Sequence, residues 1–560
     1  MNYSKQRSRE SRAAIERMYI TMRHLFIRGS YKPLGVSGKS LIEALHILKP
    51  EIYGDIDDTE RVDMEGLLYV AERLPKGIEE CRFIQLVARE GFEEAGHTVI
   101  MPIKRRRNCY RIDNDRMYVE MSRGRSDIYD ILTHLTYLYI EAEKICTHAL
   151  DLKDRPTDNW LRLSEVVEFQ ENEQSFDEKR ALVYLSNVLG RTVEETRKAV
   201  EDFERSPGCN SLYHFAYWLG KVAIDEHVND NRREVMVSAK LKDVVGHHIY
   251  GEKWAHALKD VIAQKNWLSR PVHIISANLH SFLNTLYGFQ ALQDQKFTNL
   301  EDLAVHTSSR GAADSNRIIR EYALENGLTE IRDRSGTNLT VQLIDLEKVD
   351  LERLPLNLKN PEGEKPLLLV MDYAFGEQAF ECMDELLKPF ESENLSQSLN
   401  VKSVSIMGKA GILEGNKGDL MIPTAHVFEG TADNYPFQND LSKSDFEDTG
   451  LGVYEGPMIT VLGTSLQNRD VLHHFQTSTW NAIGLEMEGA HYQKAIQSAA
   501  RIRKSIAADV KVRYAYYASD NPLVTGSTLS SGSLGAEGVK PTYWISLRIL
   551  EKILGTPIGK

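Results

Sequence analysis

The stretch Pro366-Leu-Leu-Leu-Val-Met371 decides the fold, because it is apolar throughout and short enough for one strand. Such a strand is expected where helices cover both faces of a sheet. Further strands are predicted at 401–407, 458–462 and 510–517, and helices at 377–387, 488–503 and 542–554. This alternation predicts an α/β domain over residues 365–560, a three-layer arrangement with helices on both faces of a parallel or mixed sheet.

Two regions are expected before this domain. Apolar residues recur at helical spacing through much of residues 1–234, and Thr192 and Glu195 form a capping-box pattern, so we expect a helical N-terminal domain there. Residues 235–350 contain short strand and helix candidates, which predict a small α/β middle region. Residues 351–364 are rich in Leu, Pro, Asn, Glu and Gly and are interpreted as a linker.

Composition excludes several classes of protein. The 560 residues allow three or four domains at roughly 150 residues each. The net charge of −13 argues against a general nucleic-acid binder, and no apolar run reaches the roughly 20 residues of a membrane span. The N-terminal residues lack the apolar stretch of a secretory signal, and the five cysteines show no paired spacing. We therefore expect a cytoplasmic protein with reduced thiols that binds neither nucleic acid nor membrane.

Three loops that follow predicted strands carry the chemistry. They are Gly408-Lys-Ala-Gly411 with the later Gly418-Asp419, Leu485-Glu-Met-Glu-Gly489, and Ala518-Ser-Asp-Asn-Pro522. Ligands of open α/β sheets bind at the carboxyl ends of strands, where such loops meet. Glycines there let an anion or a sugar hydroxyl approach backbone amides.

These three loops, in this order and spacing, resemble the glycine loop, ribose loop and catalytic-acid loop of the nucleoside phosphorylase/nucleosidase superfamily. That superfamily includes purine and uridine phosphorylases, methylthioadenosine/S-adenosylhomocysteine nucleosidases and AMP nucleosidases. The resemblance covers residues 365–560, and Ser519-Asp-Asn-Pro-Leu523 is most similar to the AMP nucleosidases. Residues 1–360 resemble no family that we recognise.

The resemblance implies cleavage of the N-glycosidic bond of a purine-type nucleoside or nucleotide. It assigns to Asp520 the role of general acid toward the leaving base, and to Glu488 the ribose hydroxyls. Met487 would pack beneath the sugar, and Glu486 is a possible second contact to ribose or water. The other expected substrate contacts are Gly408, Lys409, Gly411 and Ser519. Members of the superfamily are commonly oligomers, so a homo-oligomer is expected.

The sequence departs from the superfamily at two places. Lys409 stands where phosphorolytic members have serine, which favours hydrolysis, although Lys409 could also bind inorganic phosphate as a co-substrate. No other cofactor and no metal is expected. The glutamate that follows the first strand in the nucleosidases has no clear counterpart, and Asp372 and Glu377 are the nearby acids.

Plainer interpretations stay open for each motif. Asp520 before Asn-Pro is also typical of a turn, and Glu486 with Glu488 is also typical of the acidic start of a helix. Gly408 and Gly411 are compatible with ordinary turns, and Lys409 with a surface position.

Other polar residues have structural interpretations too. The histidines at 247, 248 and 256 and at 273 and 280 are interpreted as structural, although the second group could line another pocket. The basic run 104–107 is typical of a solvated face, with an anion site as the alternative. A second hypothesis for the whole chain is a regulatory protein that keeps the fold, senses a nucleotide and has lost catalysis.

Overall fold

The structure is a computed structural model that describes residues 2–356, 358–359, 361, 363–393, 395–524 and 535–555. The chain divides into two compact units. Unit 1 comprises Met1–His247 together with Ser465–Val471, and unit 2 comprises His248–Thr464 together with Leu472–Lys560. Within the described ranges, no helix combines the length and the apolar character needed to cross a membrane.

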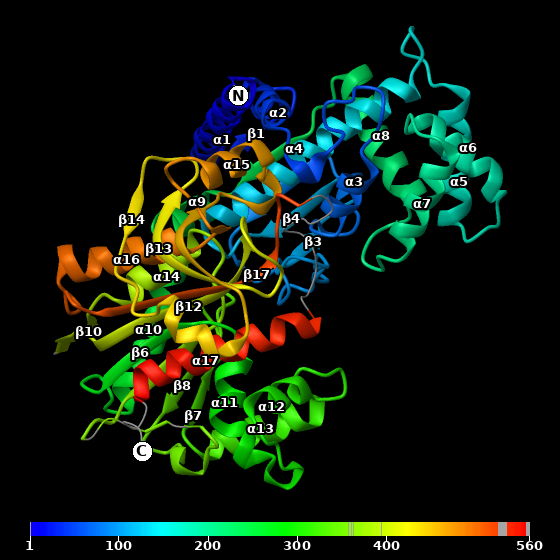
Figure 1. Cartoon of the computed structure of the whole chain (residues 1–560). Helices are drawn as coiled ribbons and strands as arrows, with labels where there is room; N and C mark the ends of the chain where they lie inside the picture. The colour runs from blue at the N-terminus through cyan, green and yellow to red at the C-terminus, as the bar shows by residue number, and fades with distance from the viewer. Residues whose placement is uncertain are drawn as a thin grey trace. The chain divides into compact units, whose positions relative to one another are not determined.

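Unit 1 is mostly helical, as the sequence predicts. Its helices are α1 (Asn2–Arg28), α2 (Val36–Leu48), α3 (Met64–Ala71), α4 (Gly124–Ala149), α5 (Asp158–Glu171), α6 (Glu178–Val188), α7 (Val193–Glu204), α8 (Leu212–Asn229) and α9 (Ala239–Gly246). The capping box at Thr192 and Glu195 opens α7. Helices α5, α6 and α7 pack as a group at one end of the unit (Figure 1).

Unit 1 also contains a small sheet that the prediction of a helical domain missed. Its strands lie in the order β1 (Ser30–Tyr31), β5 (Glu234–Val237), β2 (Phe83–Val87), β4 (Arg116–Glu120) and β3 (Cys109–Arg111). β2 runs parallel to both β4 and β5, so the strands that pair are far apart in the sequence. Periodicity within one short segment cannot reveal such long-range pairing.

Unit 2 is built on one ten-stranded mixed sheet. Its strands are β6 (Pro271–Ser276), β7 (Leu328–Ile331), β8 (Val341–Asp345), β9 (Leu367–Met371), β12 (Asn400–Ile412), β13 (Leu420–Phe428), β14 (Asn434–Pro436), β15 (Val453–Thr460), β16 (Gly484–Glu486) and β17 (Lys511–Asp520). A separate hairpin pairs β10 (Phe390–Ser392) with β11 (Leu395–Gln397).

The sheet joins two regions that the sequence suggested were separate. β6 lies between β9 and β12 and is parallel to both. β8 pairs with the edge of β9 that faces away from β6. The strands of the expected middle region, 235–350, therefore belong to the same sheet as those of residues 365–560. The described part of the expected linker, 351–364, connects two neighbouring strands of that sheet, β8 and β9.

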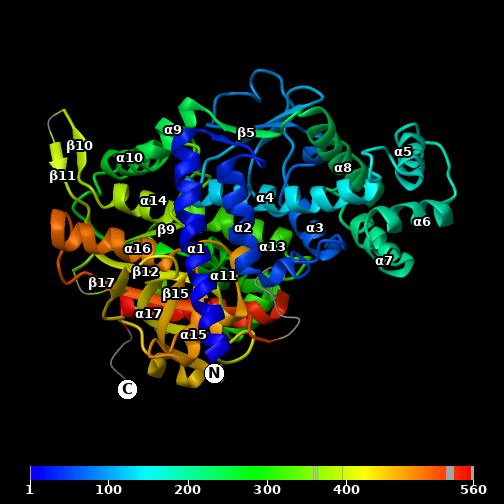
Figure 2. The ribbon, with the colours of Figure 1, turned by 90° about the horizontal axis from the view of Figure 1, so that it is seen from above.

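Helices cover the two faces of this sheet. They are α10 (Ile249–Gln264), α11 (Leu279–Ala291), α12 (Leu300–Thr307), α13 (Ala313–Glu325), α14 (Gln378–Leu386), α16 (Gly489–Gln497) and α17 (Val539–Leu554). A further helix, α15 (Arg469–Thr477), lies between β15 and β16 in the sequence. Figure 2 shows α10, α14 and α16 in succession on one face, where α14 packs against the other two. α11, α12, α13 and α17 form the group on the opposite face.

β9 shows why its sequence decides this arrangement. Leu367, Leu369 and Met371 enter the core beneath α10, α14 and α16, whereas Leu368 and Val370 enter the core of the opposite face. Successive strand residues point to opposite faces, so a strand buried on both sides is apolar throughout.

Five of the strands close into a ring. β12 pairs with β16 and β17, β16 pairs with β15, β15 pairs with β13, and β13 pairs with β17. This pairing brings residues near 411, 486 and 520 into one neighbourhood, although they are far apart in the sequence.

Candidate functional site

The candidate site lies where β6, β9, β12 and β17 end. These four strands are parallel, so their carboxyl ends share one edge of the sheet. Gly411 of β12 lies between Leu485 of β16 and Asp520 of β17 in the register. Strands are spaced about 4.8 Å apart, so the backbones of Leu485 and Asp520 are about 10 Å apart.

Asp520 is a buried carboxyl group at the end of β17, with 3% of its surface exposed. Its Oδ2 atom is buried and has no hydrogen-bond partner within the described residues. Burial raises the pKa of Asp520 above its usual value, and the Ser519 hydroxyl and the charges of Lys409 and Lys417 oppose that rise. The carboxyl group is therefore biased toward its protonated form.

Ser519 is the extra residue of a β-bulge, since the register passes from Ala410 opposite Ala518 directly to Gly411 opposite Asp520. Its hydroxyl oxygen lies 2.5 Å from Asp520 Oδ1 and 3.1 Å from the carbonyl oxygen of Ala410. One hydroxyl proton cannot be donated to both oxygens fully. When Asp520 is ionised, Ser519 donates its proton to Oδ1, which stabilises the carboxylate and opposes the effect of burial on the pKa of Asp520.

The position of Glu486 matches the structural interpretation of its motif, that of an acid at the start of a helix. Its carboxylate accepts hydrogen bonds from the Thr460 hydroxyl and from the amides of Glu488 and Gly489. The Glu488 amide nitrogen lies 2.5 Å from the carboxylate oxygen. Burial by itself would raise the pKa of Glu486, but the His426 side chain, Thr460 and the Gly489 amide together lower it. Glu486 is thus a buried anion that holds the start of α16.

Glu488 and Met487 are both half-buried, in contrast to Glu486. Glu488 Oε1 accepts the amide of Gly376 at 2.9 Å. Gly376 belongs to the loop between β9 and α14, which also carries Asp372 and Glu377. The contact fixes Glu488 at the shared edge of the sheet.

Gly408 and Gly411 do not form a loop, because β12 continues as a strand to Ile412. Gly408 lies opposite Tyr516, and a Cβ atom there would be 3.3 Å from the tyrosine ring. Lys409 between the two glycines is exposed, and its positive charge acts to lower the pKa of Asp520. The loop that follows contains Gly418, whose φ of +89° favours glycine.

The glycines of the ribose-loop motif are required by packing. A Cβ atom at Gly489 would lie 2.2 Å from the imidazole of His426, and one at Gly484 would lie 2.4 Å from the sulfur of Met421. His426 is fully buried and stacks on Phe437. The local packing of the fold therefore requires glycine at both positions.

Sequence reasoning missed the residues that support the site. Thr460 and His426 hold Glu486, and Gly376 holds Glu488. Thr460 and His426 lie on β15 and β13, whose pairing with β16 and β17 is visible only in three dimensions. Gly376 did leave a signal in the sequence, because a glycine shortly after a fully apolar strand is typical of a turn, and in the structure its φ is +55°.

Several other polar residues have structural roles. The basic run at 104–107 is a solvated face only in part, because Lys104 and Arg106 are exposed whereas Arg107 is buried and pairs with Asp127 and Asp130. His273 is buried and hydrogen-bonds to the Ser403 hydroxyl at 2.8 Å, and burial lowers its pKa to about 4. All five cysteines are free thiols.

About half of the chain is similar in structure to several nucleosidases. A methylthioadenosine/S-adenosylhomocysteine nucleosidase of Campylobacter jejuni is 11% identical, with 50% of this chain and 98% of that chain covered and a TM-score of 0.30. Futalosine hydrolase of Helicobacter pylori is 10% identical, with 50% and 97% covered and a TM-score of 0.30. AMP nucleosidase of Bacteroides thetaiotaomicron is 14% identical, with 54% and 98% covered and a TM-score of 0.29.

The sequence itself matches the family of unknown function DUF6909 over residues 39–306 and 305–555, and the chain belongs to that family. No curated protein matches the sequence.

Proposed function

We propose that unit 2 cleaves the N-glycosidic bond of a purine-type nucleoside or nucleotide. The observation that carries this proposal is the buried carboxyl group of Asp520, whose Oδ2 has no partner at the edge where the ribose-loop residues gather. A carboxyl group of raised pKa that lacks a partner for one oxygen is suited to general acid catalysis.

In the proposed reaction, the bond between the anomeric carbon of the ribose and the base nitrogen breaks, and its electron pair leaves with the base. Asp520 donates its proton to a ring nitrogen of the base. Water adds to the anomeric carbon, and its released proton restores the acid form of Asp520. The products are the free base and ribose, or ribose 5-phosphate from a nucleotide.

Glu488 is proposed to hold the ribose hydroxyls, with Met487 beneath the sugar. Glu488 is half-buried and fixed by the Gly376 amide, and its carboxylate can accept hydrogen bonds from two hydroxyl groups. Strand spacing supports this assignment, because the separation between β16 and β17 across β12 is similar to the size of a nucleoside. Glu486 is excluded from the ribose role in this proposal, because its oxygens already accept protein donors.

A panel of purine nucleosides and nucleotides, with and without inorganic phosphate, tests the proposal. Release of free base that does not require phosphate is expected, because Lys409 replaces the serine of phosphorolytic enzymes. Dependence on phosphate would shift the assignment to a phosphorylase. Binding without turnover across the panel would favour the second hypothesis, a nucleotide-sensing regulatory protein.

A further inference from the structure

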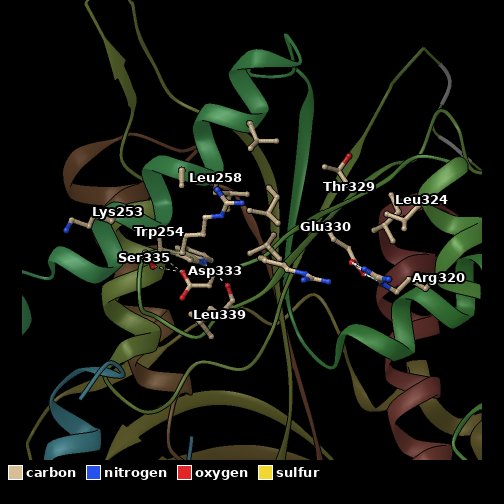
Figure 3. Close-up of a pocket in the computed structure, with 17 residues that line it drawn as sticks. Lys253, Trp254, Leu258, Arg320, Leu324, Thr329, Glu330, Asp333, Ser335 and Leu339 are labelled. Atoms are coloured by element: carbon tan, nitrogen blue, oxygen red, sulfur yellow. Dashed lines mark hydrogen bonds and ion pairs between the residues drawn. The ribbon is translucent and has the colours of Figure 1, made fainter. Parts of the chain in front are cut away.

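Unit 2 contains a cavity of about 810 Å³ that the proposed reaction does not use. Its lining comes from α10, α13, β7 and residues 332–335, together with Leu339 and with Val341 of β8. Figure 3 shows Trp254 and Leu258 on one side and Leu324 and Arg320 on the other. A volume of this size lies within the range of small-molecule sites, about 300–1,000 Å³.

The cavity is separate from the Asp520 site. β7 is the last strand of the sheet, and β8, β9 and β6 lie between it and β12. Four strand spacings place β7 about 19 Å from β12, which is too far for one nucleoside to reach both places.

Apolar side chains form much of the wall, including Leu258, Val261, Leu328 and Ile331. The wall is anchored, because the indole nitrogen of Trp254 donates to the carbonyl oxygen of Leu339 at 3.1 Å. A fixed apolar wall suits the apolar body of a small molecule.

The two acidic side chains of the lining already accept hydrogen bonds from the protein. Glu330 accepts a two-point ion pair from Arg320, with the Arg320 Nε atom 2.9 Å and 3.0 Å from its two oxygens (Figure 3). Asp333 accepts the amides of Ser335, Gly336 and Asn338 at 2.8–3.1 Å. The charge of Glu330 is offset by Arg320, whereas Asp333 keeps its negative charge because its partners are neutral amides.

Three cations of the lining are unpaired. Lys253, Arg332 and Arg334 are exposed, and they make no ion pair or hydrogen bond with any residue that the structure describes. Four cations and two carboxylates line the cavity, whereas the whole chain carries a net charge of −13. The cavity is thus locally positive in an acidic protein, and such a cleft concentrates anions.

We propose that this cavity is a binding site for an organic anion with an apolar body. The carboxylate, sulfonate or phosphate group of the ligand would meet Arg332, Arg334 and Lys253 at the rim. Arginine is suited to this contact because its planar guanidinium presents paired donors to such oxygens. The apolar body would rest against Leu258, Val261 and Ile331.

Two fluorescent probes of similar body test this proposal in the full chain. 8-Anilinonaphthalene-1-sulfonate carries the anionic group, and N-phenyl-1-naphthylamine lacks it. The variants are Arg332→Gln with Arg334→Gln, and a matched control, Lys296→Gln with Arg310→Gln, which removes two exposed cations that do not line the cavity. A third variant, Val261→Trp, fills the cavity.

The sulfonate probe is expected to bind the wild type, and the Arg332/Arg334 variant should bind it about tenfold or more weakly, while the control pair matches the wild type. The neutral probe should bind wild type and variant within about twofold of each other, since the lost bonds involve only the anion. Val261→Trp with an unchanged melting temperature should bind neither probe. Equal affinity of wild type and the Arg332/Arg334 variant for the sulfonate probe would overturn the proposal. Undiminished binding by a folded Val261→Trp variant would overturn it as well.

Discussion

Replacing Ser519 with alanine tests the proposed acid through its pKa. The Ser519 hydroxyl lies 2.5 Å from Asp520 Oδ1, both residues are buried, and this contact lowers the pKa of Asp520 against the effect of burial. A hydrogen bond to a charged group contributes about 1.5–3 kcal/mol, so the Ser519→Ala substitution removes about that much stabilisation of the Asp520 carboxylate. The pKa of Asp520 should therefore rise further in this variant.

The assay is the pH dependence of kcat/KM for release of the base. A general acid must be protonated to act, so the alkaline limb of the profile reports its pKa in the free enzyme. That limb should move to higher pH in Ser519→Ala and stay in place in Ser309→Ala, which alters an exposed serine. An alkaline limb that does not move, or that moves to lower pH, refutes the reasoning.

Three further predictions follow from the same contacts. Gly489→Ala should lower the stability measured by thermal unfolding by about 1–3 kcal/mol, because the added methyl group clashes with the buried His426. The control Gly246→Ala should keep its stability, because an added Cβ atom has open space there, and an equal loss of stability in both variants would contradict the prediction. The raised pKa of Asp520 predicts that the free energy of unfolding falls as pH rises from the unfolded-state pKa of Asp520 through its folded-state pKa. Asp520→Asn should remove this contribution, and an unchanged dependence of stability on pH in that variant would argue against the raised pKa. Glu488→Gln keeps an acceptor oxygen for the Gly376 amide but loses its charge, so kcat/KM should fall about tenfold at unchanged melting temperature; an unchanged kcat/KM would remove Glu488 from the site.

The sequence predicts a helix or strand of unit 2 well where the pattern of apolar residues within that one segment is sufficient to identify it. The apolar stretch at 366–371 forms β9, and the helices expected at 377–387 and 542–554 are α14 and α17 within a few residues. A mixed α/β C-terminal region and a mostly helical N-terminal half are thereby confirmed.

Long-range pairing is the part that the sequence does not reveal. β6 pairs with β9 and β12, which lie more than 90 residues later, so the expected middle region is part of the main sheet. In unit 1, Phe83 of β2 lies opposite Arg116 of β4, 33 residues later, and opposite Glu234 of β5, 151 residues later.

The same limit applies to the candidate site. The resemblance around 484–490 gives Glu488 the ribose hydroxyls and Glu486 a possible second contact, but the motif does not reveal that Glu486 is held by the protein itself. The role of Glu486 depends on Thr460 and His426, which come from other strands and make Glu486 a structural anion. The bulge at Ser519 depends likewise on the register of β17 against β12.

The most direct test of the central claim is a single-turnover measurement of base release by the wild type and Asp520→Asn at saturating substrate. The exposed-site variant Asp509→Asn is the matched control. We predict that Asp520→Asn binds the nucleoside with nearly wild-type affinity but releases base about 10²–10⁴-fold more slowly, while Asp509→Asn behaves like the wild type. Equal rates of base release by the wild type and Asp520→Asn would contradict the assignment of Asp520 as the proton donor.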